Sequence, residues 1–507
     1  MISPVTQARK LAVSVYLLRS YHITTQVATA RRVPLIHLPE HAHIHLLAAC
    51  GTAMGSLAGM LRQRGYRVTG SDAHVYPPMS DFLREEGIEL CDGFDAQNIV
   101  PAPDLVVVGN AVSRGNPELE AVLESRIPYT HLPEVLRDLF LQGRRPLVVS
   151  GTHGKTTTTA LTAHLLRVGG VDPSWLVAGL PQDLPRPHHV GGGDWFVLEG
   201  DEYDSAYFAK FAKFLFYRPH LLIVNNIEFD HADIFRDLEE IRQAFRQVVN
   251  QVPHSGLVLA GGDDGVVAEV ITDAPAPVMR FGLGSDNDWR AVDIRQEGGR
   301  QSFELLGPDG SAGRMRLSLL GQHNLRNALA ALAAASFAGL EPAALAHALE
   351  NFVGVKRRQQ HLGTIAEVTL IDDFAHHPTA VHETLAGLRE GYPHRRLWTI
   401  FEPASSTNTR DTFENDYADA FAHTDLAIIG AVVRPERSRE DKPFSSVRLV
   451  DRLRGKGIEA WHLADAETIA SHICTNSRPG DIVVFMSNAG FGGVQAKTVA
   501  ALENYTR

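Results

Sequence analysis

The chain has 507 residues, which is too long for one hydrophobic core and makes three domains a natural expectation. Its formal charge of -11 disfavours binding along a nucleic-acid backbone, and no apolar run is long enough to cross a bilayer. The three cysteines, Cys50, Cys91 and Cys474, match neither a disulfide framework nor a zinc spacing, and they indicate a reducing, cytoplasmic compartment.

Residues 1–40 form an N-terminal extension that we expect to be disordered. Residues 1–39 carry five basic and no acidic side chains. This bias is shared with transit peptides, but no proper cleavage signal follows it.

The first folded unit is predicted to start with the strand 43–49, followed by a short glycine-containing turn and a helix to Arg64. A second strand, 67–70, ends at Ser71 and Asp72. Asp72 lies about 20 residues beyond the turn, as an acid that contacts a ribose would. The strict glycine pattern is not met at Ala48 and Ala49, so this is a weak nucleotide signal.

His41, His43 and His45 alternate along one face of the first strand. A metal site is one interpretation. Structural or solvent-facing histidines are the other, and we favour it because no fourth ligand is evident.

The second unit opens with the strand 146–150 and the segment Gly151–Thr157, of sequence Gly-Thr-His-Gly-Lys-Thr-Thr, before a helix over 158–167. A strand, a glycine-rich turn and a helix are the context that a phosphate loop requires. Backbone N–H groups would surround the phosphates, Lys155 would reach the terminal ones, and Thr156 would offer a hydroxyl to Mg²⁺. Val149 replaces the first glycine of the general motif, and a simple strand–helix turn is the alternative.

Two further segments of the second unit supply candidate Mg²⁺ ligands at strand ends. Glu199 to Asp204 contains four acids directly after an apolar strand, and carboxylates are natural Mg²⁺ ligands. A later strand, 223–224, leads to Asp230 and His231. A solvated acidic loop and a surface histidine are the plain alternatives.

Asn324 and Asn327 are three residues apart at the start of an alanine-rich helix, so they share one helical face. They could bind the edge of a base, or Asn324 could cap the helix. In the third unit, Asp373 and His376 follow the strand 369–371, and such a pair suits contact with a ribose or a phosphate.

Strand runs alternate with helical patterns along most of the chain, which predicts an α/β fold of mostly parallel sheets. We expect three domains, over residues 41–141, 142–353 and 354–507.

The ordered set of motifs resembles the Mur ligase family of bacterial cell-wall synthesis over residues 43–495. The set comprises the Gly-Thr-His-Gly-Lys-Thr-Thr loop, Glu-x-Asp-Glu at 199–202, Asp-His at 230–231, His-Asn-x-x-Asn at 323–327 and Asp-Asp-x-x-His-His-Pro at 372–378. The resemblance implies two Rossmann-like domains around a central phosphate-loop ATPase domain. It also implies an ATP- and Mg²⁺-dependent ligase that activates a carboxylate as an acyl phosphate and joins it to an amine.

The resemblance also implies roles for individual residues. The first domain would bind UDP near Gly51, Thr52, Met54, Ser71, Asp72, Asn110 and Ala111. ATP would lie against Gly151, Thr152, His153, Gly154, Lys155, Thr156, Thr157, His323, Asn324, Asn327, Arg358, Asp373 and His376. The catalytic residues would be Lys155, Glu199, His231 and Arg358, and the Mg²⁺ ligands Thr156, Glu199 and His231.

Within the family, several segments are similar to the branch that joins UDP-N-acetylmuramate to the tripeptide L-alanyl-γ-D-glutamyl-meso-diaminopimelate in peptidoglycan recycling. The segments include Asp201–Asp204, Glu228–Phe235 and Ser487–Gly493. The branch that adds free L-alanine is the alternative. Ala404 stands where an arginine is usual, so contact with the amine substrate is expected from Ser405 and Arg410. From another class, a nucleotide sensor without catalysis is disfavoured because Lys155, Thr156, Glu199 and His231 are intact.

Overall fold

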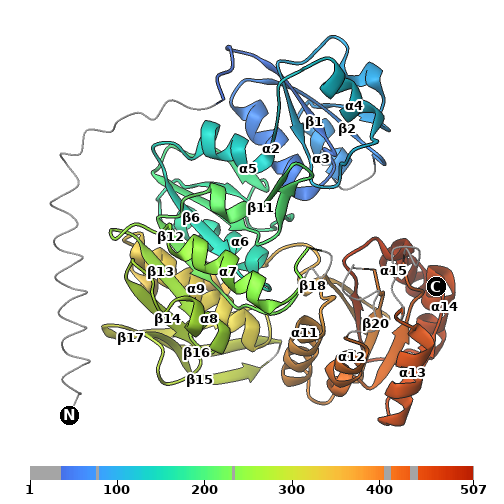
Figure 1. Cartoon of the computed structure of the whole chain (residues 1–507). Coiled ribbons are helices and arrows are strands. Elements are labelled where there is room, and N and C mark those ends of the chain that lie inside the picture. The colour runs from blue at the N-terminus through green and yellow to red at the C-terminus, as the bar shows by residue number, and fades with distance from the viewer. Residues whose placement is uncertain are drawn as a thin grey trace.

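A computed structural model describes residues 36–75, 79–230, 234–297, 299–404, 413–433 and 443–505. Three predicted site residues, His231, Ser405 and Arg410, and nearly all of the N-terminal extension lie outside these ranges. Within them the chain forms three α/β units that follow one another from the top of Figure 1 to its lower right. The predicted division into three units therefore matches the arrangement of the sheets, while the individual domain limits stay predictions.

The first unit contains a parallel sheet of order β3-β2-β1-β4-β5 among the described residues. Its strands are β1 His43–Leu47, β2 Arg67–Asp72, β3 Glu89–Asp92, β4 Leu105–Val108 and β5 Tyr129–His131. Its helices are α2 Thr52–Gln63, α3 Met79–Glu85, η1 Ala96–Ile99, α4 Pro117–Glu124, α5 Leu132–Val135 and η2 Leu136–Phe140. The strand order reverses between β1 and β4, which is the position where ligands bind in open α/β sheets.

The central unit contains a larger sheet, of order β17-β16-β15-β14-β13-β12-β6-β9-β7-β8 in the described part of the chain. Its strands are β6 Arg145–Ser150, β7 Ser174–Leu176, β8 His188–His189, β9 Trp195–Gly200, β12 Leu221–Val224, β13 Leu257–Gly261, β14 Val278–Gly282, β15 Trp289–Glu297, β16 Arg300–Gly307 and β17 Gly310–Leu317. A separate hairpin joins β10 Asp204–Ala206 to β11 Ala209–Ala212. The helices of the central unit are α6 Lys155–Val168, η3 Lys213–Phe216, α7 Leu238–Val249, α8 Gly265–Val270, α9 Gln322–Phe337, η4 Pro342–Leu345 and α10 Ala346–Glu350.

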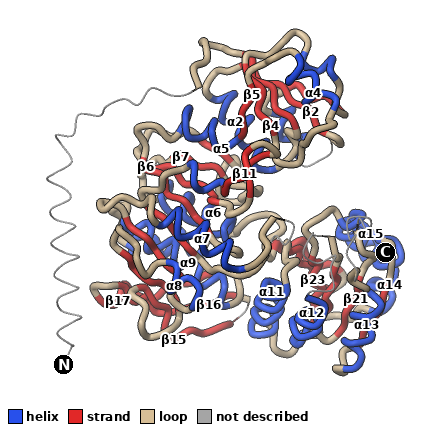
Figure 2. The backbone as a smooth tube through the Cα atoms, in the orientation of Figure 1, coloured by secondary structure: helices blue, strands red, loops and turns tan. Residues whose placement is uncertain are grey.

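Helices cover both faces of this central sheet, and the residues of β6 show how (Figure 2). Val148 packs into the apolar cluster that contains α7 and α8, whereas Leu147 and Val149 pack into the one that contains α6 and α9. Successive strand side chains point to opposite faces, so a continuous apolar run is what a strand buried on both sides requires.

The third unit has a sheet of order β18-β19-β23-β20-β21-β22 over its described residues. Its strands are β18 Gln360–Ile365, β19 Val368–Asp373, β20 Leu397–Phe401, β21 Leu426–Ile429, β22 Glu459–His462 and β23 Ile482–Met486. Its helices are α11 Pro378–Gly391, α12 Glu414–Ala420, η6 Phe421–His423, α13 Ser446–Gly455, α14 Ala466–Asn476, η8 Phe491–Gly493 and α15 Val494–Tyr505. Helices α11 to α13 cover one face, and α14 and α15 cover the other.

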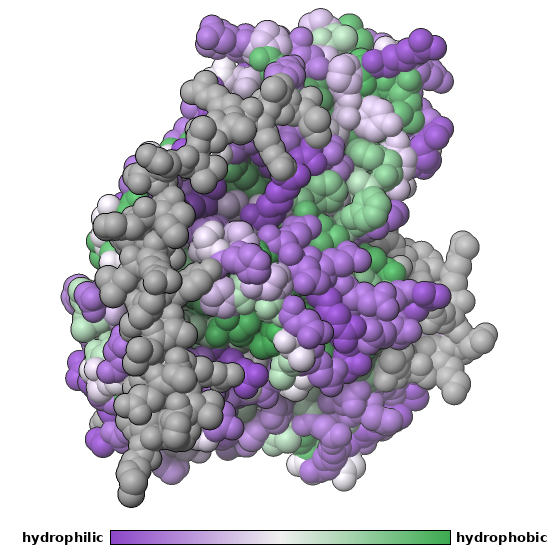
Figure 3. Space-filling model, turned by 60° about the vertical axis from the view of Figure 1, so that its left-hand side comes forward, coloured by the Kyte–Doolittle hydropathy of each residue, from purple (hydrophilic) through white to green (hydrophobic). Residues whose placement is uncertain are grey.

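The predicted alternation of strands and helices is confirmed, with small differences at the ends of elements. Helix α6 begins at Lys155 rather than at Thr158, directly after Gly154. After α9 the chain forms two short helices in succession, η4 and α10. Figure 3 shows a mainly hydrophilic surface with small groups of hydrophobic residues on the face in view. No helix in the described part of the chain is both long and apolar enough to cross a membrane.

Candidate active site

The turn between β6 and α6 has the backbone of a phosphate loop. Gly151 and Gly154 have φ values of +131° and +81°, which strongly favour glycine. A Cβ atom on Gly154 would lie 2.4 Å from Oδ1 of Asn327, so a larger residue would also be excluded by contact. The N-terminal amides of α6 are thereby directed at the turn, as anion binding at a helix N-terminus requires.

Lys155, the first residue of α6, is largely buried beside two carboxylates of the acidic segment. Its Nζ donates to the carbonyl oxygen of Gly151 at 2.8 Å and to Oε2 of Glu202 at 2.8 Å, and it lies 3.8 Å from Oδ1 of Asp201. Burial alone would lower the pKa of Lys155, but the nearby carboxylates outweigh it and the pKa is raised. Lys155 is therefore a charged ammonium group held at the mouth of the loop.

Thr156 and Glu199 are brought into direct contact, as expected for two ligands of one metal ion. The Thr156 hydroxyl donates to Oε2 of Glu199 at 2.8 Å, and the Ala178 amide donates to Oε1 at 2.6 Å. Burial, followed by the charge of Asp201, raises the pKa of Glu199. A carboxylate that is hard to ionise without a cation beside it suits a hard cation such as Mg²⁺.

Lys213 is a charged neighbour of the site that the sequence did not single out. Its Nζ lies 3.0 Å from Oδ2 of Asp201, and both residues are buried. Burial would raise the pKa of Asp201, but Lys213 and Lys155 lower it to about 2. The sequence feature that could have identified Lys213 is its place inside the aromatic run 211–216. A lysine in such a run is expected to be buried, and a buried lysine needs a charged partner.

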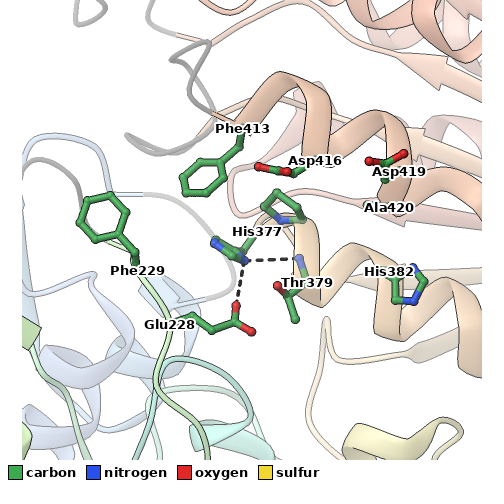
Figure 4. A pocket seen from close by; sticks show the side chains of 10 residues that line it. Glu228, Phe229, His377, Thr379, His382, Phe413, Asp416, Asp419 and Ala420 are labelled. Carbon is green, nitrogen blue, oxygen red and sulfur yellow. Dashed lines mark hydrogen bonds and ion pairs between the residues drawn. The ribbon is translucent and has the colours of Figure 1, made fainter. Parts of the chain in front are cut away.

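His153 points away from the metal pair and joins a contact with the third unit. Its Nε2 lies 3.1 Å from Oε2 of Glu228, and Nδ1 of His377, at the start of α11, lies 3.5 Å from the same oxygen (Figure 4). These three ligand atoms lie within 4.8 Å of one another, so they could also hold a metal ion. No sequence motif indicates that His153, Glu228 and His377, from three separate segments, would meet.

The pKa values of His377 and Glu228 in this contact are shifted by burial and by the contact with His153. Burial, together with His153, lowers the pKa of His377 to about 4, so this imidazole is neutral at neutral pH. Burial would raise the pKa of Glu228, but the hydrogen bond from His153 prevails and lowers it.

Asn324 and Asn327 lie on one face of α9, as predicted, but their amides bind within the protein. Asn327 donates to Oδ1 of Asn324 at 3.1 Å and accepts from the hydroxyl of Thr158 at 3.1 Å, which connects α9 to α6. Asn324 donates to the Leu320 carbonyl oxygen at 2.8 Å. Gly321 rather than Asn324 precedes the first residue of the helix, so the capping alternative is wrong.

His323 lies at the junction between the central and third units. Its Nε2 is 3.3 Å from Nε2 of Gln359, and its Nδ1 is 3.7 Å from a carboxylate oxygen of Glu383. It is partly exposed, in contrast to the two buried asparagines of the same helix.

The predicted group of the third unit is assembled around the start of β18 and the end of β19. The guanidinium of Arg358 lies 4.5 Å from the centre of the Phe374 ring. Asp373 accepts the backbone N–H groups of Gln359 and Ala375, each at 2.7 Å. Burial lowers the pKa of Arg358 and raises that of Asp373, while the charges of Asp373 and Glu199 act in the opposite direction on Arg358.

His376, the last residue of this group, binds its own turn, where Nδ1 lies 3.0 Å from the carbonyl oxygen of Phe374.

The predicted UDP residues lie together at the carboxyl ends of β1, β2 and β4. Gly51 precedes α2, and Oδ2 of Asp72 accepts the backbone N–H of Cys50 at 2.8 Å. The Ser71 hydroxyl donates to the buried Glu118 at 3.0 Å. The remaining members are Thr52, Met54, Asn110 and Ala111.

The three histidines predicted to alternate along the first strand differ in position: His41 precedes β1 and is exposed, His43 is half-buried, and His45 is buried in the core of the first unit. His43 and His45 both lie within hydrogen-bond distance of the Thr69 hydroxyl, at 2.9 and 2.7 Å. Nε2 of His45 lies 2.6 Å from the buried carboxylate of Glu118. These contacts agree with the structural interpretation of the alternating histidines.

Three segments of the chain match described domain families. Residues 43–144 match "Mur ligase family, catalytic domain", residues 149–335 match "Mur ligase middle domain", and residues 357–489 match "Mur ligase, glutamate ligase domain".

Full-length relatives and solved structures agree with these matches. The chain is 39% identical over 461 residues to the UDP-N-acetylmuramate–L-alanyl-gamma-D-glutamyl-meso-2,6-diaminoheptandioate ligase of Escherichia coli (strain K12), covering 90% of this chain and 98% of that protein. It is 32% identical over 464 residues to the UDP-N-acetylmuramate–L-alanine ligase of Dechloromonas aromatica, covering 90% and 98%. A solved murein peptide ligase from Psychrobacter arcticus is 34% identical, with a TM-score of 0.70 and coverage of 91% and 99%.

Proposed function

The chain belongs to the Mur ligase family, and from this premise we propose that it joins UDP-N-acetylmuramate to the tripeptide L-alanyl-γ-D-glutamyl-meso-diaminopimelate with consumption of ATP. The observation that carries the proposal is the difference in identity between the two kinds of relative. Identity is 39% to the tripeptide ligase and 32% to the alanine ligase, over nearly the same length. The reaction would return recovered wall peptide to the cytoplasmic pool.

The proposed reaction has three steps. The lactyl carboxylate attacks the γ-phosphate of ATP and forms an acyl phosphate, with ADP as leaving group. The neutral L-alanine amine of the tripeptide attacks the acyl carbon, forms a tetrahedral intermediate and loses one proton to solvent. Collapse of that intermediate releases phosphate and leaves the amide.

Lys155 is assigned to the phosphates because its ammonium is charged and directed at the loop. Phosphoryl transfer is accelerated mainly by positioning and by charge stabilisation. Nζ of Lys155 donates to Oε2 of Glu202 at 2.8 Å, so binding of ATP would exchange one anionic partner of the lysine for another.

Thr156 and Glu199 fit a Mg²⁺ site, because a hydroxyl and a buried carboxylate already face each other at 2.8 Å. A bound Mg²⁺ supplies charge neutralisation on the transferring phosphate. We assign His231 as a further ligand, on the resemblance of its motif alone.

The third unit would complete the ATP site through Arg358, Asp373 and His376. Arg358 and Glu199 lie close enough for their charges to interact across the domain boundary. Closure over ATP would keep water from the acyl phosphate. The first unit would bind UDP at the carboxyl ends of its strands, and Ser405 and Arg410 remain assigned to the amine substrate.

A competition between amines tests the proposal. The purified protein is given ATP, UDP-N-acetylmuramate and equal amounts of tripeptide and L-alanine, and the products are separated by mass. We expect at least a tenfold preference for the tripeptide, a difference of about 1.4 kcal/mol. Mainly L-alanine product would assign the chain to the biosynthetic branch, and no ADP release with UDP-N-acetylmuramate would favour a sensor.

A further inference from the structure

A cavity of about 500 Å³ lies between the central and third units, beside the contact of His153 with Glu228. Its wall is formed by the segment after β12 and by α11 and α12 (Figure 4). The lining residues include Glu228, Phe229, His377, Phe413, Asp416 and Asp419. Because Glu228 also contacts the phosphate loop, the cavity adjoins the place where the acyl phosphate would form.

One buried polar atom in this wall has no partner. His377 is 5% exposed, and its Nε2 has no hydrogen-bond partner among the described residues. Figure 4 shows this nitrogen on the side of the ring that faces Phe229 and Phe413. An unpaired buried polar atom is costly, so a ligand group that binds it would be stabilised.

The tautomer of His377 follows from its other nitrogen. Nδ1 accepts the backbone N–H of Thr379 at 3.4 Å, as the N-cap of α11. An accepting Nδ1 leaves the proton of a neutral imidazole on Nε2. His377 therefore presents an N–H donor to the cavity, and the natural ligand of such a donor is a carboxylate.

The other lining residues favour a ligand that has a cationic group and an apolar chain. Asp416 is exposed and makes no hydrogen bond or ion pair with the described part of the chain, whereas Asp419 lies 2.5 Å from Nζ of Lys456. No described lining residue is Lys or Arg. Phe229 and Phe413 add apolar surface to the wall, and Figure 4 shows the Phe413 ring between Phe229 and Asp416.

We propose that this cavity binds the free amino-acid end of the diaminopimelyl residue, with Nε2–H of His377 donating to its carboxylate and Asp416 accepting from its ammonium group. The assignment rests on the proposed function. In the tripeptide, one amino group of the 2,6-diamino acid forms the peptide bond, so the other end keeps its ammonium and carboxylate. The methylene groups between the two ends suit the phenyl rings. L-Alanine has a single amino group, which is the nucleophile in its neutral form, and cannot fill this cavity.

Three peptides separate the contributions of the distal ammonium and the distal carboxylate to recognition. They are the tripeptide, the same peptide with L-lysine as third residue, and the dipeptide L-alanyl-γ-D-glutamate. Lysine keeps the distal ammonium and lacks the distal carboxylate, and the dipeptide lacks both. Asp416→Asn should lower kcat/KM about tenfold for the tripeptide and the lysine peptide, mainly through KM, and leave the dipeptide unchanged. Asp451→Asn, an exposed matched change on α13, should leave all three unchanged.

His377→Asn tests the carboxylate contact, because asparagine keeps a cap for α11 and removes the ring donor. It should lower kcat/KM about tenfold for the tripeptide and spare the lysine peptide. An equal loss for these two peptides would overturn the role of His377.

Failure of the cavity assignment and failure of the proposed function give different results. Wild-type protein that ligates the tripeptide while Asp416→Asn is unaffected, or loses activity equally on the dipeptide, overturns the cavity assignment alone. Wild-type protein that ligates L-alanine and no peptide overturns the proposed function and the cavity assignment with it.

Discussion

Two turns in this molecule have the same local design and different chemistry. The first joins β1 to α2 and the second joins β6 to α6, and each follows a buried parallel strand and precedes a helix. In the first turn a protein carboxylate, that of Asp72, already binds the Cys50 amide. In the second turn the protein adds an ammonium group, that of Lys155.

The difference shows that a glycine-containing turn does not define its ligand. In the first turn, burial and, to a smaller extent, the charge of Asp72 raise the pKa of Cys50 to about 11, and Asp72 is the charged group that binds the turn. The second turn is balanced by Lys155, Lys213 and three buried acids, Glu199, Asp201 and Glu202. Of the two turns, the second therefore has the buried ammonium groups that could stabilise the charge of a transferring phosphate.

Lys155 is the charged group that distinguishes the second turn from the first, so its removal should have the largest effect on activity. Lys155→Ala is expected to reduce ligation by a factor of about a thousand or more, because the lysine stabilises transition-state charge in a buried site. Product formation and ADP release measure the loss, and thermal unfolding checks the fold. Lys210→Ala, a change of an exposed lysine in the nearby hairpin, is the control and should stay within about twofold of wild type. Near-normal turnover of a folded Lys155→Ala protein would remove the phosphate-loop assignment.

The metal pair of the second turn can be examined by a double-mutant cycle. Thr156→Val and Glu199→Gln should each raise the Mg²⁺ concentration needed for half-maximal activity and lower turnover by roughly a hundredfold. Because both would serve one ion, the double variant should lose less than the sum of the single free-energy changes. Fully additive losses would show that the two residues act independently. His231→Ala can be added to the same cycle.

The first turn should respond to Asp72→Asn through substrate binding alone. Asparagine keeps an oxygen that accepts the Cys50 N–H, but it lacks the carboxylate that would bind the ribose. Loss of that ribose contact should cost about 1 kcal/mol of binding free energy. We expect KM for UDP-N-acetylmuramate to rise about fivefold, while kcat and KM for ATP change less than about twofold. Steady-state kinetics with each substrate varied separately makes the measurement. An unchanged KM for UDP-N-acetylmuramate would place the ribose elsewhere.

The last expected effect is on stability rather than activity, and it concerns how α2, the helix after the first turn, packs on the central unit. His188 of β8 lies against Gly59 of α2, and burial, with a smaller effect of Arg186, lowers its pKa to about 4. Between pH about 6.5 and 4 the unfolded chain then binds more protons than the folded one, so the free energy of unfolding falls as the pH falls. The slope from this residue is at most about 1.4 kcal/mol per pH unit.

His188→Gln should flatten this pH dependence. Urea unfolding at pH 5 and pH 7.5 measures it, and the wild-type protein should lose more stability between the two values than the variant. Equal losses in the two proteins would assign the acid sensitivity to other buried histidines, such as His220.

The sequence by itself determined the local units of this protein. Apolar runs such as 146–150, followed by a glycine-rich turn and a helical pattern, were sufficient to place β6, the turn and α6. Both predicted turns exist for the same reason, since strand and helix periodicity and the φ values that glycine permits are properties of short segments. The family resemblance added the roles of the motifs and could not supply their geometry.

The tertiary structure alone decided which side chains meet. Lys155 contacts Glu202 across 47 positions of sequence, and Thr158 contacts Asn327 across 169. Glu228 contacts His153 across 75 positions and His377 across 149. No periodic pattern encodes such pairs, because they depend on how the three sheets and their helices pack. Burial and the neighbouring partners together then set their protonation, since the cost of a buried charge depends on partners that only the folded chain provides.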